Sequence, residues 1–406
     1  MKKHYTLSEV ADMLSVSKET LRRWDRNGKL TAVREPMSNY RVYKQSQLKI
    51  FDELDFLFKK ETVSNSVNPI KQFTSIELFA GAGGLAIGLE EAGIKCLALN
   101  EIDHWAAETL RKNRPDWNII EDDIKNISFN ELKHKVDIVT GGFPCQAFSY
   151  AGKKLGLQDA RGTLFYEFAR IVKDTRPLIC VGENVRGLLN HDGGRTIEGM
   201  KSILDEIGYH VIPPKILKAI FYKVPQKRER LLLVGIRKDL DSHLFEFPKP
   251  HKKIYCLKDA LKKGDLFPKD VPGSPGQQYP KTKKEVLHLV PQGGYWRDLP
   301  LSIQKDYMGK SFYLGGGKTG MARRMSWNEP SLTLTCSPAQ KQTERCHPEE
   351  TRPFTVREYA RIQTFPDNWE FAGSITQQYK QIGNAVPVNL AKEIGFSIIN
   401  FLNKVT

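Results

Sequence analysis

A cysteine on a tight turn is the residue of this sequence with the clearest chemical potential. Cys145 follows Gly141-Gly142-Phe143-Pro144, and these follow the apolar run of residues 136–140. Such a run is typical of a buried strand, and the glycines and the proline force a tight turn. We therefore expect the thiol at the end of a strand. A thiolate adds readily to an electron-poor carbon, although a single cysteine is more often a small buried hydrophobic residue.

Charged and polar residues border two later apolar runs. Glu183 and Asn184 follow residues 178–181, and Arg228 and Arg230 precede residues 231–234. Two positions apart on a strand, the arginines would face the same side. A carboxyl group whose pKa is raised by burial can donate a proton near neutral pH. The sequence thus offers an acid and a cation that could act with a nucleophile.

A glycine-rich turn predicts a cofactor site. Phe79-Ala80-Gly81-Ala82-Gly83-Gly84 stands between an apolar run and a helix pattern. The glycines let the backbone come close to a ligand, and the helix N-terminus offers free amides. Glu101, about twenty residues further on, can accept hydrogen bonds from ribose hydroxyls. NAD would use the same features, but a cysteine loop at this place has no use in hydride transfer.

Six motifs in one order resemble the DNA (cytosine-5) methyltransferase family. The resemblance covers residue 73 to the C-terminus. The motifs are the glycine-rich turn at 79–84, Gly142-Phe143-Pro144-Cys145-Gln146, Gly182-Glu183-Asn184-Val185, the Gln-Lys-Arg-Glu-Arg run at 226–230, the Arg-Pro-Phe-Thr-Val-Arg-Glu run at 352–358 and the Gln-Ile-Gly-Asn-Ala-Val-Pro run at 381–387. The resemblance implies a doubly wound, Rossmann-like α/β core that binds S-adenosylmethionine.

The family's cofactor contacts map onto matching positions. In the family an acid at the position of Asp123 accepts from the adenine amino group; a glycine usually precedes it, and this chain has Asp122 there. The expected contacts are Phe79, Ala82, Gly83, Gly84, Glu101, Ile102, Asp123, Ile124, Gly142, Pro144, Leu164, Asn384 and Ala385.

The expected chemistry starts from the weak nucleophilicity of carbon 5 of cytosine. Addition of Cys145 to carbon 6 would activate it, with Glu183 donating to nitrogen 3, Asn184 orienting the base edge, and Arg230 beside Arg228 contacting the base carbonyl. A base inside a duplex cannot be reached, so the target must be flipped out, at a cost of a few kcal/mol.

The first sixty residues predict a second DNA-binding unit. Thr6 and Glu9 form a capping box, and Ser17 can cap a second helix that ends at Gly28. Alternating residues at 30–33 and 40–43 predict a two-stranded wing, and residues 46–60 a third helix. The unit resembles the winged helix-turn-helix domain of MerR-type proteins. The expected DNA contacts are Lys18, Arg22 and Arg23 on the second helix and Arg34, Tyr40 and Arg41 on the wing.

The elements that position these residues alternate from residue 73 onward. Apolar runs at 75–79, 96–100, 136–140, 178–181 and 231–234 are typical of a parallel sheet, with helix patterns at 85–92, 104–113 and 163–173 between them. The expected domains are a winged helix at 1–60, a linker at 61–72, a catalytic domain at 73–240 that returns at 351–406, and a loop-rich target-recognition domain at 241–350. In the last, Arg297, Arg323 and Arg324 are candidate DNA contacts.

Composition agrees with a DNA-binding enzyme. The net charge of +15 and the pI near 9.3 favour a polyanionic partner. The cysteines show no metal-binding spacing, and no transmembrane or signal segment is expected, so we expect a cytoplasmic protein without a metal.

The resulting hypothesis is a sequence-specific DNA (cytosine-5) methyltransferase that pairs with a restriction endonuclease. Its N-terminal unit represses its own operon or adds DNA affinity. Two rivals remain: a tRNA cytosine-5 methyltransferase, and a transcriptional regulator with an inactive methyltransferase domain.

Overall fold

A mixed sheet forms the centre of the largest domain. The computed structural model describes residues 4–36, 39–59, 66–144 and 163–406. The strand order is β10-β12-β8-β7-β4-β5-β6, with β9 also paired to β12. The strands are β4 (Thr74–Leu78), β5 (Lys95–Asn100), β6 (Ile119–Ile120), β7 (Ile138–Gly141), β8 (Ile179–Val185), β9 (Tyr209–Val211), β10 (Lys215–Lys218) and β12 (Glu229–Arg237). Every strand that the apolar runs predict is present.

The expectation of a purely parallel sheet is wrong at one edge. The strands from β4 to β8 pair in parallel with one another, whereas β12 runs antiparallel to β8, β9 and β10. In β12, Leu231 and Leu233 pack on one face and Leu232 and Val234 on the other. An apolar run predicts that a strand is buried on both faces, but it does not predict the direction of the strand.

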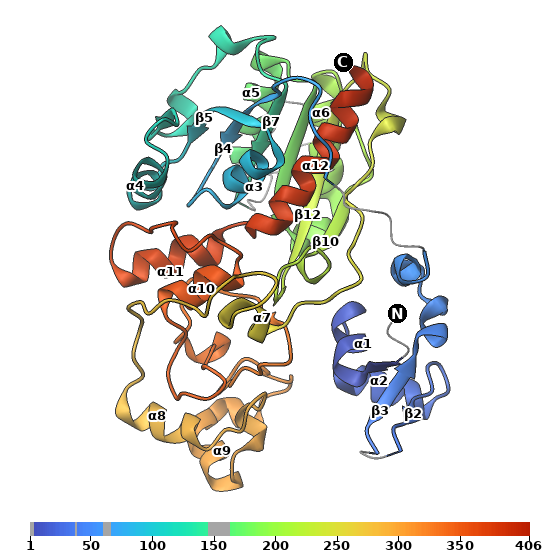
Figure 1. Cartoon of the computed structure of the whole chain (residues 1–406), viewed down its shortest axis with the longest axis vertical. Helices are drawn as coiled ribbons and strands as arrows, with labels where there is room; N and C mark the ends of the chain where they lie inside the picture. The colour runs from blue at the N-terminus through green and yellow to red at the C-terminus, as the bar shows by residue number, and fades with distance from the viewer. Residues whose placement is uncertain (1–3, 37–38, 60–65, 145–162) are drawn as a thin grey trace.

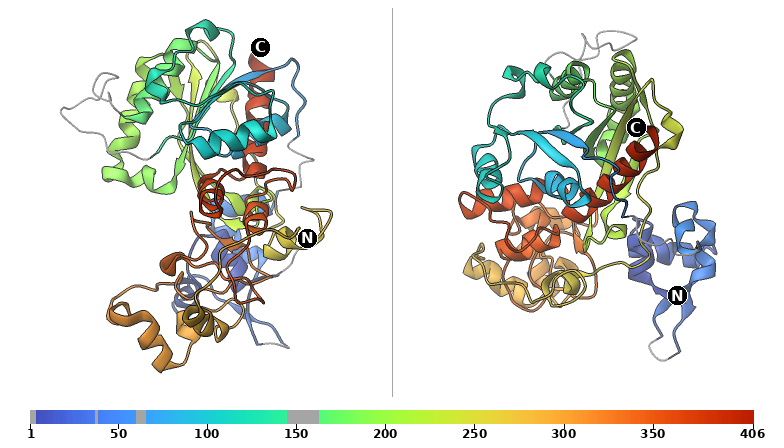
Figure 2. Two further views of the ribbon diagram at one scale, coloured as in Figure 1. Left: turned by 90° about the vertical axis from the view of Figure 1, so that its left-hand side faces the viewer. Right: turned by 45° about the horizontal axis from the view of Figure 1, so that its top comes forward.

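Helices cover both faces of the sheet, which confirms the doubly wound α/β core (Figures 1 and 2). α3 and α12 pack on one face, and α5 and α6 on the other. The helices of this domain are α3 (Gly84–Ala92), α4 (His104–Asn113), α5 (Leu164–Thr175), α6 (Arg195–Glu206), α10 (Val356–Ile362), α11 (Ile375–Asn384) and α12 (Val388–Val405). In the described part of the chain, no helix is both long and apolar enough to span a membrane.

The loop-rich segment contains a small core of its own. Apolar residues between Tyr279 and Cys346, with Trp296 and Met308 among them, form a separate cluster. Its regular elements are short: α7 (Leu257–Leu261), α8 (Lys281–His288), α9 (Leu301–Met308) and β13 (Ser331–Leu332). β13 pairs with β11 (Gln226–Lys227), which fixes this segment beside the start of β12.

The N-terminal module, residues 4–58, has the expected helix-turn-helix and wing. Thr6 and Glu9 form the capping box of α1 (Leu7–Met13), and Ser17 caps α2 (Lys18–Arg26). β1 (His4–Thr6), β3 (Arg41–Lys44) and β2 (Val33–Arg34) form a sheet. The third helix expected at 46–60 is wrong.

Two 3₁₀ helices replace that third helix. They are η1 (Gln45–Ile50) and η2 (Asp52–Leu57). Phe51 between them has an extended backbone, and its ring stacks on Trp24 with centroids 5.7 Å apart. The packing of Phe51 on α2 is therefore favoured over a continuous helix through this residue.

Candidate active site

A cavity of about 950 Å³ opens at the carboxyl ends of β4, β5, β7 and β8. Strand order reverses between β4 and β7, and open α/β sheets bind their ligands at such a point. The predicted cofactor residues that line this cavity are Phe79, Gly84, Glu101, Ile102, Asp123, Ile124, Gly142, Pro144, Leu164, Asn384 and Ala385. The predicted catalytic residues Glu183, Asn184, Arg228 and Arg230 line the same cavity.

Ala82 and Gly83, although part of the glycine-rich turn, are not among the residues that line the cavity, so their contact with a cofactor stays a prediction. Ala82 is buried in the apolar core. Gly83 has a φ of +84°, and a Cβ there would lie 2.7 Å from Leu110 and 3.2 Å from Trp369. These two residues shape the turn by packing.

Glu101 holds the glycine-rich turn against the end of β5. Its Oε2 accepts a hydrogen bond from Gly81 N at 2.6 Å, and its Oε1 accepts from Asp103 N at 2.7 Å. The side chain is buried, and burial raises its pKa. A carboxylate has about four acceptor positions, so two remain for the hydroxyls of a ribose.

Two positions in the cavity wall leave little room for a Cβ. A Cβ on Gly84 would lie 2.2 Å from Val386 O, and one on Gly142 would lie 3.1 Å from Glu183 Oε2. Phe79 has a φ of +58° at the end of β4, an arrangement that costs about 1–3 kcal/mol and often marks a functional site. A nucleoside-bearing cofactor fits these residues.

Asp122 forms the turn for which the family uses glycine. Its Oδ1 accepts from Asp123 N at 2.7 Å and from Asn126 Nδ2 at 2.9 Å. Asp122 is not among the described residues with a positive φ, so the turn does not require glycine. Asp123 lies at the cavity wall.

Glu183 and Arg230 form a buried ion pair that faces the cavity. Glu183 Oε1 meets Arg230 Nε, and both residues are 8% exposed. The pair is possible because β8 and β12 are neighbours in the sheet. Burial raises the pKa of Glu183, and the positive charge of Arg230 opposes this rise. The arrangement keeps a proton-donating group and a cation at the same point.

Asn184 holds the turn that leads to Cys145. Its Nδ2 donates to Phe143 O at 2.8 Å, and its Oδ1 accepts from Val185 N at 2.8 Å. In the structure the Asn184 amide therefore positions this turn, whereas the sequence predicted that the amide contacts the base. Cys145 lies outside the described residues; Pro144, which precedes it in the sequence, lines the cavity.

Arg228 links segments of the chain that are distant in the sequence. It stands between β11 and β12, is 2% exposed, and donates to the carbonyls of Leu334, Gly383 and Asn384 at 3.0–3.3 Å. Its guanidinium is committed to backbone oxygens. The strand is interrupted at Arg228, yet Arg228 and Arg230 both line the cavity, as expected for two residues that face the same side.

The adjacent Arg323 and Arg324 have different surroundings. Arg324 is 4% exposed and donates to the carbonyls of Leu287, Val290 and His347. It is a structural residue, so its prediction as a DNA contact is wrong. Arg323 lines a second cleft, has a buried Nε without a partner among the described residues, and lies over Tyr295. The exposed Arg297 lines the same cleft.

Substitutions of these two arginines should have different effects on stability and on DNA binding. Arg324→Ala should lower the free energy of unfolding by about 3 kcal/mol or more, because it leaves several buried carbonyls unpaired. Arg323→Ala should leave that free energy within about 1 kcal/mol of the wild type and weaken DNA binding. Urea unfolding and a DNA-binding titration separate the two effects. Similar unfolding curves for both variants would contradict the assignment.

The basic residues of the N-terminal module point in several directions. Lys18 and Arg22 line the second cleft, whereas the exposed Arg23 is outside its lining. Arg34 and Tyr40 are exposed on the wing. Arg41 is bound to Asp25 at 2.7 Å, so it joins the wing to α2, and its prediction as a DNA contact is not supported.

Glu77 is a cavity residue that sequence reasoning missed. It is 2% exposed, and its Oε2 has no hydrogen-bond partner in the described part of the chain. Burial and the nearby charge of Glu101 raise the pKa of Glu77 to about 8. An acidic residue inside an apolar strand run was the available signal.

One group of side chains has the spacing of metal ligands among the described residues. It consists of His104, Glu108 and Glu121 on the surface. Arg111 pairs with Glu108 at 2.8 Å and with Glu121 at 2.5 Å. A cation already neutralises both carboxylates, so this group gives no support for a metal site.

Comparisons with known proteins agree with this geometry. Residues 73–400 match the family model described as C-5 cytosine-specific DNA methylase, and residues 6–43 match the MerR family regulatory protein model. M.Eco47II, a type II methyltransferase of Escherichia coli, is 62% identical over 100% of this chain and 97% of its own length. M.PspPI of Psychrobacter sp. is 57% identical over 98% and 97%, and M.Sau96I of Staphylococcus aureus is 53% identical over 87% and 82%.

Solved structures show the same fold at lower identity. A DNA modification methyltransferase encoded within an E. coli prophage aligns with a TM-score of 0.62 and 23% identity, over 82% of this chain and 100% of its own. A Spodoptera frugiperda DNMT2 variant aligns with a TM-score of 0.56 and 18% identity, over 80% and 99%. With the family match over most of the sequence, the chain belongs to the C-5 cytosine-specific DNA methylase family and is a DNA (cytosine-5) methyltransferase.

Proposed function

We propose that this enzyme methylates carbon 5 of a cytosine that is flipped out of duplex DNA at one short sequence. The observation that carries the proposal is the buried Glu183–Arg230 pair, which faces the same cavity as Glu101 and Pro144. An acid, a cation, a nucleotide-binding carboxylate and the turn that leads to a cysteine thus surround one space.

The residues suit S-adenosylmethionine, the methyl donor that this family generally uses. Glu101 would accept from the ribose hydroxyls and Asp123 from the adenine amino group, while the turn at Gly84 and the open space at Gly142 would admit the remainder. When bound, the cofactor supplies an electrophilic methyl group to carbon 5 of the activated ring.

The residues of the chain activate the ring. The thiolate of Cys145 adds to carbon 6 while Glu183 gives its proton to nitrogen 3, so that the electrons gained by the ring are held there. Arg230 steadies the carboxylate that Glu183 becomes. After methylation a base takes the proton from carbon 5, and the Cys145 sulfur leaves carbon 6 with its electron pair, which restores the double bond between carbons 5 and 6. Nitrogen 3 returns its proton to the Glu183 carboxylate. Asn184 is a positioning residue because it holds Phe143, two residues before Cys145.

A restriction-modification role is part of the proposal. The relatives that match over nearly the whole chain are named type II methyltransferases, and protection of a fixed sequence from a partner endonuclease is the corresponding role. Bisulfite sequencing of DNA from cells that express the enzyme should give methylated cytosine at one position of one motif. Methylation without a common motif would overturn this role.

Glu101 supplies a test of the cofactor assignment. Glu101→Ala should raise the Kd for S-adenosylmethionine by about ten- to a hundredfold, because each hydrogen bond to a charged group contributes about 1.5–3 kcal/mol. Isothermal titration of the full chain measures this change. Glu121→Ala, which removes an exposed carboxylate outside the cavity lining, is the control. Equal cofactor affinity in both variants would contradict the assignment.

A further inference from the structure

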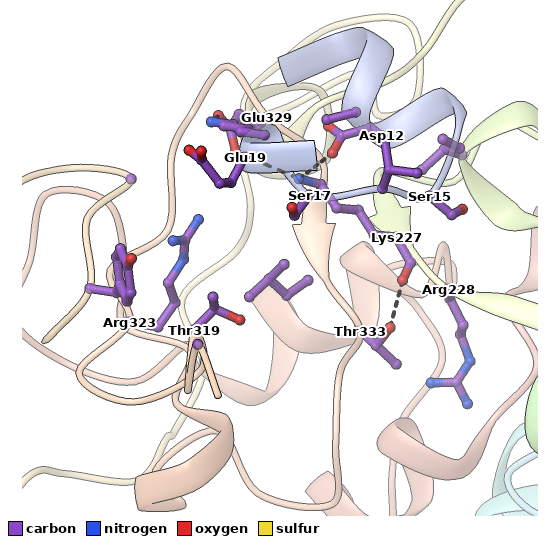
Figure 3. Close-up of a pocket in the computed structure, with 18 of the residues that line it drawn as sticks. Asp12, Ser15, Ser17, Glu19, Lys227, Arg228, Thr319, Arg323, Glu329 and Thr333 are labelled. Atoms are coloured by element: carbon purple, nitrogen blue, oxygen red, sulfur yellow. Dashed lines mark hydrogen bonds and ion pairs between the residues drawn. The ribbon is translucent and has the colours of Figure 1, made fainter. Parts of the chain in front are cut away.

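A second cleft, of about 1150 Å³, lies between three parts of the chain (Figure 3). One wall is formed by Lys227 of β11 and Arg228 before β12, and another by the loop-rich segment with Arg323. The third wall is the α1–α2 turn and the first turns of α2. Nine Lys or Arg residues and five Asp or Glu residues line the cleft, so its walls carry an excess of positive charge.

The second cleft adjoins the active-site cavity. Val185, Arg228, Arg230 and Thr333 line both spaces. The cavity proposed for the flipped base therefore lies next to the cleft that the N-terminal module borders. A duplex with its target base in the first space would therefore pass along the second.

The helix that a helix-turn-helix unit presents to DNA faces this cleft. Lys18, Glu19 and Arg22 of α2, at spacings i, i+1 and i+4, share one helix face and line the cleft. In Figure 3 the side chain of Arg323 points across the cleft toward Glu19. Arg26, also on α2, is outside the lining.

Specific contacts fix the module in this place. Lys227 Nζ lies 2.7 Å from Asp12 Oδ1, Lys18 Nζ lies 2.7 Å from Glu329 Oε1, and Ser15 Oγ donates to Glu229 at 2.7 Å. Apolar packing adds to these bonds, since the ring of Phe56 meets that of Phe221 at 5.0 Å.

These contacts also neutralise acidic side chains that line the cleft. Asp12, Glu229 and Glu329 are the acidic residues that take part, and each meets a basic side chain: Lys227 for Asp12, Arg186 at 2.8 Å for Glu229, and Lys18 for Glu329. Among the residues that the structure describes, Arg22 forms an ion pair only with Glu19, at 3.2 Å, and both side chains are exposed. Such an exposed pair contributes little, so Arg22 remains free to exchange it for a phosphate.

We propose that this face of α2 binds the methylation substrate itself, on the duplex beside the flipped cytosine. The N-terminal module then extends the target-DNA surface of the methyltransferase, with Arg22 as a contact to a flanking phosphate. This proposal rests on the proposed function, because the duplex is the one whose cytosine enters the active site.

The test compares two duplexes and two variants of the full chain. One duplex carries the target site with about 40 base pairs and the other with about 14, a difference of more than two helical turns. Arg22→Ala should raise KM for the long duplex about fivefold or more, leave kcat unchanged, and lower the slope of log affinity against log salt by about 1. The short duplex should show no such rise.

Arg26→Ala is the matched control, because Arg26 is on the same helix and pairs with the same Glu19. It should behave as the wild type on both duplexes. Equal KM values for Arg22→Ala and Arg26→Ala on the long duplex would overturn the proposal, as would a defect of Arg22→Ala confined to DNA upstream of the gene. Absence of methylation by the wild type on both duplexes would instead overturn the proposed function.

Discussion

Cys145→Ser is expected to reduce methyl transfer by at least about a thousandfold, because it removes the nucleophile of the reaction. A serine hydroxyl holds its proton far more tightly than a thiol, so almost no alkoxide exists at neutral pH to add to carbon 6. The change is one atom and should leave folding intact. Transfer of a labelled methyl group to duplex DNA that contains the target site measures the loss.

A second readout identifies the covalent step. On DNA with 5-fluorocytosine at the target, carbon 5 carries no proton for a base to remove, so the bond between Cys145 and carbon 6 cannot be resolved. The wild type with methyl donor should form a stable adduct on a denaturing gel, and Cys145→Ser should form none.

Cys336 provides the control for this experiment. It is the exposed thiol that lines the same cavity in the described part of the chain, and its Sγ donates to Asn384 Oδ1 at 3.2 Å. Burial raises the pKa of Cys336, which disfavours its thiolate. Cys336→Ser should therefore still form the adduct. Loss of the adduct in Cys336→Ser, with retention in Cys145→Ser, would assign the reaction to the other sulfur.

The strands and turns of the core could be predicted because their signals are local. An apolar run of the length of β7 followed by glycine and proline predicts a strand and then a turn, whatever the rest of the chain does. The same holds for the capping boxes and for the glycine-rich turn before α3. Since parallel strands bring their carboxyl ends to one edge, the residues after these runs had to meet there.

The roles of individual side chains in the site depend on contacts between segments that are distant in the sequence. Arg324 and Arg323 are adjacent in sequence, yet Arg324 is enclosed by carbonyls of the loop-rich segment and Arg323 faces a cleft. Arg228 meets backbone that is more than a hundred residues away. No spacing rule contains this information, because burial of an arginine is decided by the loops that fold around it.

The position of the N-terminal module could not be predicted from the sequence for the same reason. Its internal structure follows from caps and periodicity, but its docking depends on single pairs such as Lys227 with Asp12 and Lys18 with Glu329. Charged residues of this kind occur on every protein surface. Only the structure shows which of them meet.

Glu183→Gln is expected to lower kcat by about a hundred- to ten-thousandfold, the usual contribution of a positioned acid. The amide keeps the size of the side chain but has no proton to give to nitrogen 3. Because burial raises the pKa of Glu183, the protonated form persists to higher pH than for an exposed carboxyl. Wild-type kcat should therefore fall as the pH rises through this raised value, and the variant should lack that fall.

The control must separate lost chemistry from a disturbed ion pair. Glu167 is a buried carboxylate bound to Arg170 at 2.7 Å, away from the cavity lining. Glu167→Gln removes a comparable charge and should leave kcat and its pH profile unchanged. If Glu183→Gln retained the alkaline fall of kcat, another group would supply the proton, and Glu183 would serve only to hold Arg230. Thermal unfolding of both variants shows whether the buried arginine, once unpaired, also costs stability.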